Sequence, residues 1–360
     1  MLKTVFRLTA FVLVVIAIAV VVRTVILHED DQVSRTQISL GAEIDGDVIA
    51  GQLSKAIAIE TVSDDDPTSA TSSQFEEFAV FLQQSYPLVH EKMHLWRFPG
   101  GSLLYRWEGR SKGKAGVFLA HIDTVPVSSE EIGAWTHPPY AGTVADGFVW
   151  GRGTLDDKGG LVALMEATEL LLRKGFQPER TLYFAFGHDE ELEGRGAQTM
   201  ADEIKRLEPH GVEFVLDEGG FVTTGAIPGI DRPIAVVGIA EKGYLSLKLK
   251  VQETAGHSSA PTYPTTIGRL SRAIARLEAD PRPMRIDGAA EMMFMHLAQA
   301  MSFHQRILFA NLWLFEPVVA TALKEEPQLA AMMRTTLAPT IIKGGASVLS
   351  LKFVYICAPS

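Results

Sequence analysis

Cysteine is almost missing from this chain, and basic residues are outnumbered by acidic ones. The one cysteine, Cys357, can form no disulfide within the chain and can supply no cluster of thiolate metal ligands. Lys and Arg number 33 against 43 Asp and Glu, a formal net charge of −10, and no basic stripe with interleaved aromatic residues occurs. This balance excludes nucleic acid as the expected partner. Internal repeats are also absent from the sequence.

The overall composition is that of a globular protein. Hydrophobic residues make up 47% and charged residues 21% of the 360 residues. A chain of this length can hold two domains of ordinary size. A core of that size can be stable without disulfides.

The N-terminus contains an uncharged run of 15 residues, "LTAFVLVVIAIAVVV" (8–22). A membrane-spanning helix needs about 20 apolar residues, and the run reaches Leu27 if Arg23 snorkels to the interface. Lys3 and Arg7 before the run orient the N-terminus to the cytosol. Residues 1–28 are therefore predicted to be a signal peptide or a signal anchor.

The choice between these two alternatives stays open, because "AIA" at 17–19 resembles a signal-peptidase site. Under either alternative the body of the protein enters the secretory pathway. It is expected to be secreted, or lumenal or extracellular and anchored by a single span. N-terminal association with a membrane is the expectation under the second alternative.

Strands and helices alternate in the middle of the chain. Residues 29–75 are expected to form a polar linker and the start of a domain that continues through residues 76–237. The run "AGVFLAHIDTVPV" is typical of a buried parallel strand, and "DDKGGLVALMEATELLLRKG" is typical of a helix. The alternation continues with a strand in "TLYFAFGHDEE", a helix in "EGRGAQTMADEIKRL" and a strand in "EFVLDEGG". This order predicts an α/β fold, a mostly parallel sheet covered by helices.

The pattern changes at about residue 238. "YLSLKLKVQ" alternates apolar and polar residues, which predicts a half-exposed strand of another sheet, and residues 265–280 have the spacing of an amphipathic helix. Residues 238–345 are therefore predicted to form a smaller α+β domain. The final residues, 346–360, are an atypical tail.

Carboxylates gather where the predicted parallel strands end. Ligands of open α/β sheets bind at the carboxyl ends of the strands. Four segments bring acids and one histidine to that edge: His121, Asp123, Asp156, Asp157, Glu190, Glu191, Asp217 and Glu218. Each segment alone is better explained as a solvated turn, a helix cap or a structural histidine. Their joint occurrence favours a pair of divalent cations, and a set of His, Asp and Glu suits zinc.

Four motifs carry a resemblance to a known family. "HIDTVPV", "WGRGTLDDKGG", "GHDEELEGRGA" and "VLDEGG" resemble the di-zinc aminoacylase and carboxypeptidase family, within its carboxypeptidase S branch, over roughly residues 45–345. That branch includes secreted enzymes acting on N-fatty-acyl amino acids. The resemblance implies a zinc exopeptidase-like catalytic domain with an inserted lid or dimerisation domain. It also implies hydrolysis of the amide of N-acyl amino acids, or of the C-terminal bond of small peptides.

The resemblance assigns roles to individual residues. His121 is expected to bind one zinc, and Asp217 to bind that same zinc or the neighbouring one. Asp156 is expected to bridge both ions, and Glu191 to bind the ion that His121 does not bind. Asp123 is expected to hold the His121 ring in place, and Glu190 to act as general base on a water between the ions. Adjacent side chains diverge, so Glu191 can bind metal while Glu190 faces the water. Asp189 is expected to be structural.

Further expectations come from the resemblance alone. His257, in "TAGHSSAP", is expected to stabilise the tetrahedral oxyanion, often in a neighbouring subunit's site, which implies a homodimer through the lid domain. The peptide bond between Asp156 and Asp157 is expected to be cis. His188 and His137 have no assigned role.

The motifs also lead to an expectation about the C-terminal part. The part of the sequence that resembles the family ends at about Gly345. The histidines after His257 are His296 and His304, which lie in a stretch typical of a lid helix. One zinc would then lack its last ligand, and we expect this chain to bind zinc weakly and to hydrolyse little. The alternative function is a non-catalytic relative that binds or regulates. A purely structural membrane-anchored protein would leave the carboxylates unexplained.

Overall fold

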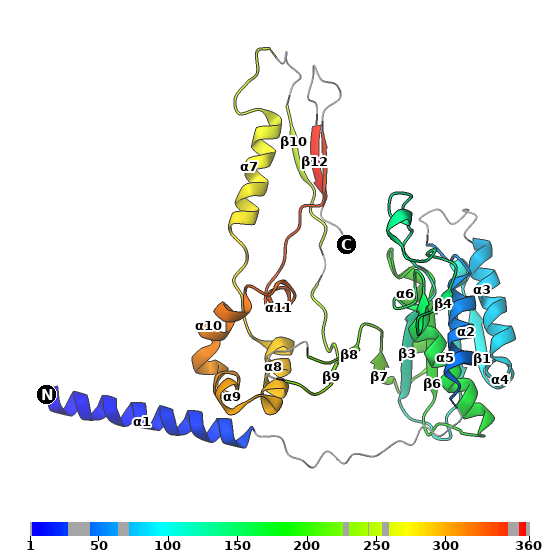
Figure 1. Ribbon diagram of the computed structural model, residues 1–360, viewed down its shortest axis with the longest axis horizontal. Helices are drawn as coiled ribbons and strands as arrows, with labels where there is room; N and C mark the ends of the chain where they lie inside the picture. Colours follow the sequence, from blue (N-terminus) through cyan, green and yellow to red (C-terminus); the bar gives the residue numbers. More distant parts are fainter. Residues whose placement is uncertain are drawn as a thin grey trace. The chain divides into compact units, whose positions relative to one another are not determined.

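The computed structural model describes residues 2–27, 44–63, 72–225, 230–243, 245–253, 259–344 and 353–357. The chain divides into two compact units, Gln37–Gly219 and a second unit made of Met1–Thr36 together with Gly220–Ser360. Each unit is described by itself below, with the elements labelled as in Figure 1.

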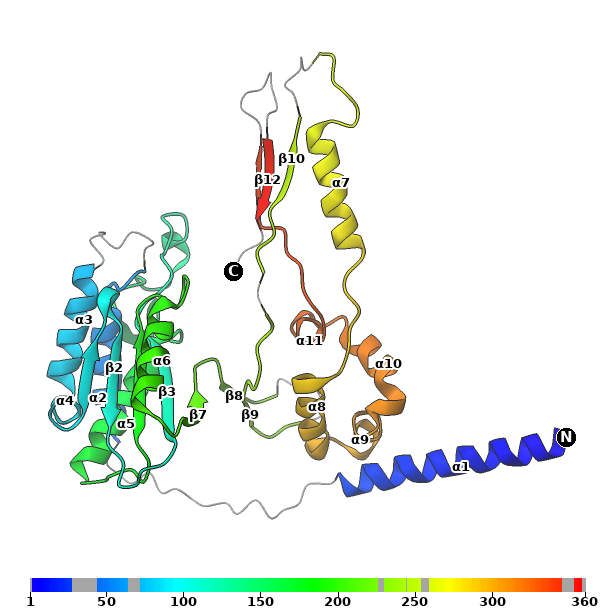
Figure 2. The same ribbon diagram turned by 180° about the vertical axis from the view of Figure 1, so that it is seen from behind.

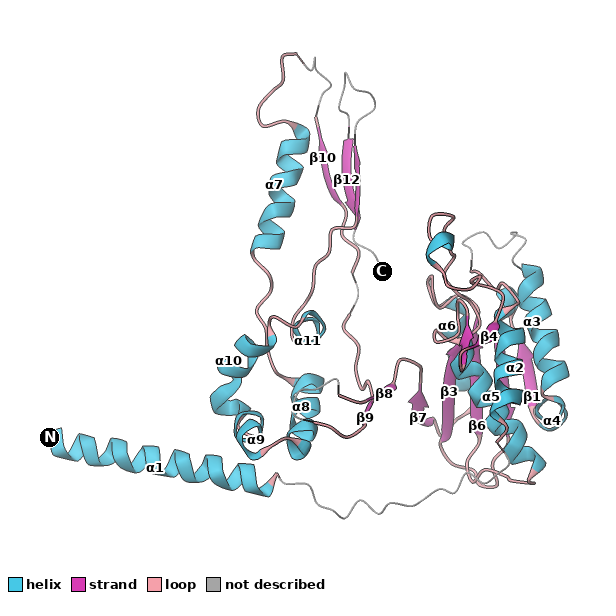
Figure 3. Ribbon diagram, viewed as in Figure 1, coloured by secondary structure: helices cyan, strands magenta, loops and turns pink. Residues whose placement is uncertain are grey.

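A five-stranded sheet is the centre of the unit Gln37–Gly219 (Figures 1 and 3). Its strands, in spatial order, are β1 (His94–Arg97), β2 (Leu103–Trp107), β6 (Leu182–Gly187), β3 (Ala115–His121) and β7 (Val212–Leu216). The strands β6, β3 and β7 are parallel, as predicted. The hairpin of β1 and β2 joins β6 antiparallel, which the sequence pattern had not indicated. The predicted α/β class is confirmed.

Helices cover both faces of this sheet. One face packs against α2 (Gly46–Ile57), α3 (Ser72–Ser85), α4 (Pro87–Lys92) and α5 (Lys158–Arg173), and the other against α6 (Arg195–Leu207). Along β6, Phe184 and Phe186 belong to the first core, while Tyr183 and Ala185 belong to the second. Successive side chains of a strand point to opposite faces, so an unbroken apolar run is buried on both sides.

The sequence of α5 explains where this helix lies and where it ends. Leu161, Met165 and Thr168 recur at helical spacing and are buried against the sheet. The helix ends at Arg173, and Gly175 follows with a φ of 69°, a left-handed conformation that glycine adopts without steric cost. The segment before α5 lies at the edge where β3 ends, because Asp156 in this segment is within 2.8 Å of His121, the last residue of β3.

Short elements complete the unit Gln37–Gly219. They are the 3-10 turns η1 (Pro99–Gly101) and η2 (Ile132–Ala134) and a separate ribbon of β4 (Thr143–Ala145) and β5 (Phe148–Trp150). The strand β7 lies at an end of the five-stranded sheet and pairs only with β3 among the described strands. Its Phe214, Val215 and Leu216 are exposed.

The second unit contains two small clusters (Figures 1 and 2). In one, α7 (Thr266–Ala279) packs its Leu270 against the antiparallel sheet of β10 (Leu249–Gln252), β12 (Phe353–Cys357) and β11 (Ile341–Gly344). The other consists of α8 (Gly288–Ala300), α9 (Phe303–Phe309), α10 (Leu312–Leu323) and α11 (Pro327–Met332). A two-stranded ribbon, β8 (Phe221–Thr223) with β9 (Ile234–Val236), and the long helix α1 (Leu2–Ile26) complete the unit.

Two sequence predictions can be compared with this unit. The amphipathic helix predicted over 265–280 is confirmed as α7. Of the strand expected in "YLSLKLKVQ", the described residues Leu249–Gln252 form β10. Within the segment 346–360, Phe353–Cys357 form β12, the middle strand of its sheet. The assignment of 238–345 as a lid domain stays a prediction.

Candidate metal centre

The candidate site lies where β6, β3 and β7 end. His121 is the last residue of β3 and is paired with Gly187, the last residue of β6. The acidic run 189–191 follows β6, and Asp217 and Glu218 follow β7. Parallel strands end at one edge, so three segments distant in sequence deliver their side chains to one place.

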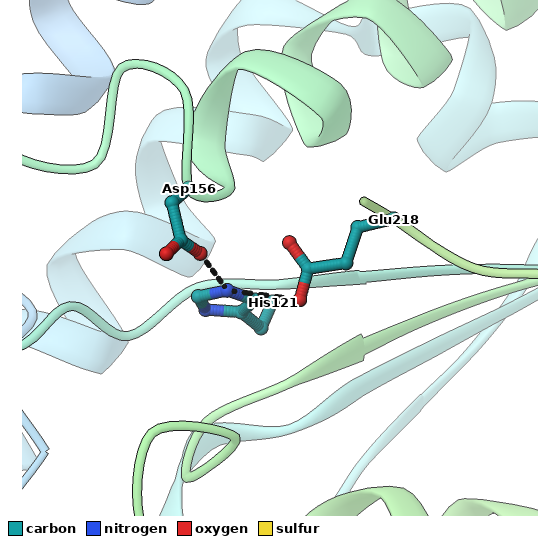
Figure 4. A group of neighbouring side chains, drawn as sticks. All are labelled: His121, Asp156 and Glu218. Carbon is teal, nitrogen blue, oxygen red and sulfur yellow. Dashed lines mark hydrogen bonds and ion pairs between the residues drawn. The ribbon is translucent and has the colours of Figure 1, made fainter. Parts of the chain in front are cut away.

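His121 is the centre of this group (Figure 4). Its Nε2 lies 2.8 Å from Oδ1 of Asp156 and 3.3 Å from Oε1 of Glu218. One donor atom from each of the three residues falls within 4.8 Å of the others. The imidazole is buried, whereas the Asp156 side chain is 68% exposed. The group is therefore reached from solvent at its Asp156 side.

The orientation of the His121 ring is set by Asp123. Nδ1 lies 2.9 Å from the backbone carbonyl of Asp123, which can only accept, so Nδ1 donates. In a neutral ring, Nε2 then presents a lone pair to the carboxylates of Asp156 and Glu218. That arrangement is repulsive unless a cation or a proton lies between them.

The pKa of His121 expresses the same excess of negative charge. Burial alone would lower it, but hydrogen bonds and charge interactions with Asp123 and Glu218 outweigh burial and raise it to about 12. The metal-free imidazole is therefore held as a cation by its carboxylate neighbours. A divalent ion would satisfy the same carboxylates and take the Nε2 lone pair.

Asp123 also holds the acidic run in place. Its carboxylate is fully buried and accepts from the backbone N–H groups of Glu190 and Glu191, each at 3.1 Å. Burial favours the neutral acid, but hydrogen bonds from His121 and Ser63 prevail and lower the pKa of Asp123. One buried carboxylate thus fixes both the imidazole and the backbone of the two glutamates.

The side chains of Glu190 and Glu191 have different surroundings. Glu190 lines a small cleft together with His121, Asp217 and Glu218. Burial raises the pKa of Glu190, and the nearby Glu218 adds to the effect. Burial also raises the pKa of Glu191, where the strongest charge interaction is with Asp156. Within the cluster of carboxylates, Glu190 therefore interacts with Glu218, and Glu191 interacts with Asp156.

Asp217, an expected zinc ligand, and its neighbour Glu218 lie differently relative to His121. Asp217 lines the cleft, but its Oδ1 accepts from the backbone N–H of Glu218 at 2.9 Å. Glu218 is the residue that approaches His121. The pair "DE" at the end of β7 was visible in the sequence, but which of two adjacent side chains turns toward the histidine depends on the local backbone.

Asp156 is positioned by the start of α5. The peptide bond between Asp156 and Asp157 is cis, as predicted. The following residue, Lys158, is buried, and its Nζ donates to the carbonyls of Ala56 (3.0 Å) and Ile59 (2.6 Å) at the end of α2. Burial lowers the pKa of Lys158 to about 7. Lys158 therefore connects the loop of Asp156 to the end of α2, a role that no sequence motif indicated.

The remaining candidates lie outside this group. Asp189 accepts from the backbone N–H groups of Arg195 (2.9 Å) and Gly196 (2.8 Å) at the start of α6. His188 lies 2.6 Å from the Ser102 hydroxyl through Nδ1. His137 contacts the ring of Trp150, with 5.2 Å between ring centroids. His257 lies outside the described residues.

The donor set matches the chemistry of a divalent metal. A histidine whose Nε2 faces several carboxylates provides donor atoms that suit zinc. Asp123 supplies the outer hydrogen bond that metal-ligating histidines usually make. The helix-covered sheet and this group at its carboxyl edge thus define a candidate metallohydrolase centre.

Comparisons with known proteins identify the family. The family described as "Peptidase family M20/M25/M40" matches residues 117–310. "Probable carboxypeptidase S-like 2" of Dictyostelium discoideum is 40% identical over 302 residues, which cover 82% of this chain and 58% of that protein. "N-fatty-acyl-amino acid synthase/hydrolase PM20D1" of Xenopus tropicalis is 40% identical over 300 residues, 81% of this chain and 57% of that protein. This chain belongs to the M20/M25/M40 peptidase family.

A solved structure supports the fold independently. The di-peptidase Dug1p of Saccharomyces cerevisiae matches with a TM-score of 0.53 and 18% identity, covering 86% of this chain and 68% of that one. The resemblance inferred from the four motifs is therefore confirmed at the level of family and fold. The chain spans less than three fifths of the length of the two curated relatives above.

Proposed function

We propose that this protein is a zinc-dependent hydrolase of amide bonds, acting on N-acyl amino acids or on the C-terminal peptide bond of small peptides. The observation that carries the proposal is the convergence of His121, Asp156 and Glu218 beside Glu190 at the carboxyl edge of the sheet. The names of the carboxypeptidase S-like and N-fatty-acyl-amino acid relatives support the choice of substrates.

Two zinc ions would be held by His121, Asp156, Glu191 and Asp217, with Glu218 as a further carboxylate close to His121. Bound zinc would supply Lewis acidity that lowers the pKa of water and polarises an amide carbonyl. The assignment of His121 rests on its fixed ring, and that of Glu191 on its electrostatic coupling to Asp156.

Glu190 takes the role of general base. Its backbone is fixed by Asp123, its side chain lines the cleft, and burial raises its pKa toward the range useful for proton transfer at neutral pH. Glu190 accepts a proton from the attacking water and returns it to the leaving amine. Asp123 acts through His121 and the backbone of Glu190. His257 would bind the developing oxyanion, on the strength of the family resemblance.

The N-terminal helix and the second unit complete the proposal. The helix α1 is long and apolar enough to cross a membrane, and it also has the properties of a signal sequence. We place the body of the protein in the secretory pathway, with the N-terminus cytosolic if α1 is retained. Residues 238–345 would act as a lid, and a homodimer would form through them.

The test is hydrolysis of a panel of N-acyl amino acids and dipeptides by the full chain, with added zinc and with a chelator. Glu190→Gln is expected to lower kcat about 10²–10⁴-fold while zinc content is retained, because a positioned base contributes about that much. Glu193→Gln is the matched control, since Glu193 lies in the same loop after β6 but is exposed and pairs with Arg195.

Zinc-independent turnover, or full activity of the Glu190→Gln protein, would contradict the mechanism. Stoichiometric zinc binding without turnover of any substrate in the panel would instead favour a binding or regulatory relative.

A further inference from the structure

The helix α10 has an exposed face that is unusual for a helix in water. All residues of α10 are described, and its exposed ones are Trp313, Leu314, Pro317, Val318, Thr321 and Ala322. They form three adjacent pairs repeated every four residues, which places them on one face of the helix. None of these six described residues is charged. Trp313 is 54% exposed and Val318 57% exposed.

The charged side chain of α10 does not interrupt this face. Glu316 is partly buried and accepts from the backbone N–H of Ile286 at 3.1 Å. The opposite face is also apolar, since Leu312 and Val319 pack into the cluster of α8 to α11. A helix that is apolar on both sides is typical of burial or of a membrane. We name the six exposed residues the α10 stripe.

A neighbouring helix of the same unit shows the ordinary pattern. On α7, the exposed residues include Arg269, Arg272, Arg276 and Glu278, as expected of a face in water. The second unit therefore has one helix with a charged exposed face and another with an apolar one. An apolar face of this kind marks an interaction surface.

Contacts with α1 indicate what covers the stripe. The Asn311 side chain, fully buried at the start of α10, donates to the Thr24 hydroxyl at 3.1 Å and to the Val20 carbonyl at 3.3 Å. Nε of Arg23 donates to the carbonyl of Ala310 at 3.3 Å. The end of α1 thus meets the junction of α9 and α10 (Figures 1 and 2).

The position of this contact along α1 is informative. If α1 crosses a bilayer with its first residues in the cytosol, Arg23 and Thr24 lie at the level of the opposite interface. The junction that is hydrogen-bonded to them must lie at that level too. Trp313 directly follows the junction, and tryptophan is enriched at membrane interfaces. The pair α9 and α10, bent by 106°, also has the length and composition of a broken span or re-entrant segment.

We propose that the α10 stripe lies in the lipid interface of the bilayer that α1 crosses, so that the second unit is held on the membrane by two elements. Asn311 joins the two elements, as polar side chains do between helices in an apolar environment. The occupant of the stripe is lipid. The proposal does not depend on the hydrolytic activity, so the two can fail separately.

The experiment uses the full chain in phosphatidylcholine–phosphatidylserine liposomes. Cys357, the only cysteine, is replaced by serine, and a single cysteine is introduced by Val318→Cys and labelled with an environment-sensitive fluorophore. We expect emission at shorter wavelength, quenching by nitroxide-labelled lipids, and protection from an aqueous quencher. The label placed by Glu278→Cys on α7 is the control, and we expect the opposite behaviour there.

A charge placed in the stripe sharpens the test. Leu314→Lys should reduce lipid quenching of the label at position 318, because a lysine near the interface draws that face toward water. Ile267→Lys, an equally apolar and exposed position on α7, should leave it unchanged. Both proteins should remain in the membrane pellet through α1.

Three outcomes would overturn the proposal. One is a label at position 318 that the aqueous quencher reaches as readily as the label at 278. Another is cross-linking between two copies through position 318 without lipid quenching, which would identify a second copy as the occupant. The third is quenching that Leu314→Lys leaves intact. If Leu314→Lys does not fold, the labels at 318 and 278 decide the matter by themselves.

Discussion

Three consecutive acids, Asp189, Glu190 and Glu191, have three different surroundings. The carboxylate of Asp189 accepts from backbone N–H groups at the start of α6. Glu190 lines the cleft beside His121, and Glu191 is coupled most strongly to Asp156. Like charges can be adjacent in sequence at low cost when each side chain finds its own donors or lies near a cation site. The buried carboxylate of Asp123, which holds the backbone of the two glutamates, makes this separation possible.

A residue-scale prediction concerns His90, away from the candidate centre. Its Nδ1 donates to the Tyr86 carbonyl at 2.9 Å, so Nε2 accepts from the Tyr105 hydroxyl at 3.0 Å in the neutral ring. Burial, reinforced by Arg97, lowers the pKa of His90 below 6.5. As the pH falls below 6.5, the unfolded chain binds a proton that the folded protein does not. The free energy of unfolding should therefore decrease in that window.

His90→Gln should flatten the pH dependence of unfolding between about pH 5 and pH 7, where a histidine of ordinary pKa titrates. The measurement is urea denaturation at several pH values. His94→Gln, on the exposed end of β1, is the matched control. A pH profile that is the same for His90→Gln and the wild type would contradict the assigned hydrogen bonds.

At the scale of elements, carboxylates from other segments satisfy the first N–H groups of two helices. Asp189 does so for α6, and Glu169 on α5 accepts from the backbone N–H groups of Leu88 (3.2 Å) and Val89 (3.0 Å) in α4. The start of α6 is tightly packed, because a Cβ on Gly196 would lie 2.8 Å from Asp189 Oδ1. Such contacts fix the helices against the loops that carry the site.

Asp189→Ala should destabilise the protein by about 0.5–2 kcal/mol, as loss of a helix cap does. Loss of the Asp189 carboxylate leaves two N–H groups of α6 without an acceptor. The loop of Glu190 also loses its attachment to the helix. The unfolding midpoint in urea measures the effect. Asp202→Ala, an exposed position within α6, should change stability by much less. Equal effects of the two substitutions would refute the capping role.

The elements themselves were predictable to different degrees. The helix α5 and the strands β3 and β6 follow from periodicity, since one face or both faces of each are buried. The antiparallel hairpin of β1 and β2 was not predicted, because its pairing with β6 joins Leu103 to Phe186 across a long stretch of chain. Local patterns carry no information about such a partner.

At the scale of the whole molecule, the candidate centre belongs to one compact unit. Residues 121 to 218, which contain all the carboxylates of the candidate centre, lie within Gln37–Gly219. A metal bound there would join the ends of β3 and β7 with the loop before α5. Binding to the folded state alone stabilises it by mass action.

Zinc should therefore raise the thermal midpoint of the purified chain, and a chelator should lower it. At a free zinc concentration 100-fold above Kd, the stabilisation should be about 2.7 kcal/mol. His121→Gln should abolish the zinc-induced rise of the thermal midpoint. His137→Gln should preserve it, because the His137 ring contacts Trp150 and does not belong to the candidate centre. Differential scanning calorimetry measures the shift. A zinc response retained by His121→Gln would exclude this group as the metal centre.

The amino-acid sequence by itself determined the family, the α/β class and the strand ends that carry the acids. These depend on local periodicity and on short motifs, which are readable along the chain. Only the tertiary structure decided that Glu218 rather than Asp217 approaches His121, that Lys158 is buried against α2, and that the exposed face of α10 has no charge in its described residues. Adjacent side chains are equivalent in a sequence. They become different when the backbone conformation turns one toward a neighbour that arrives from a distant part of the chain.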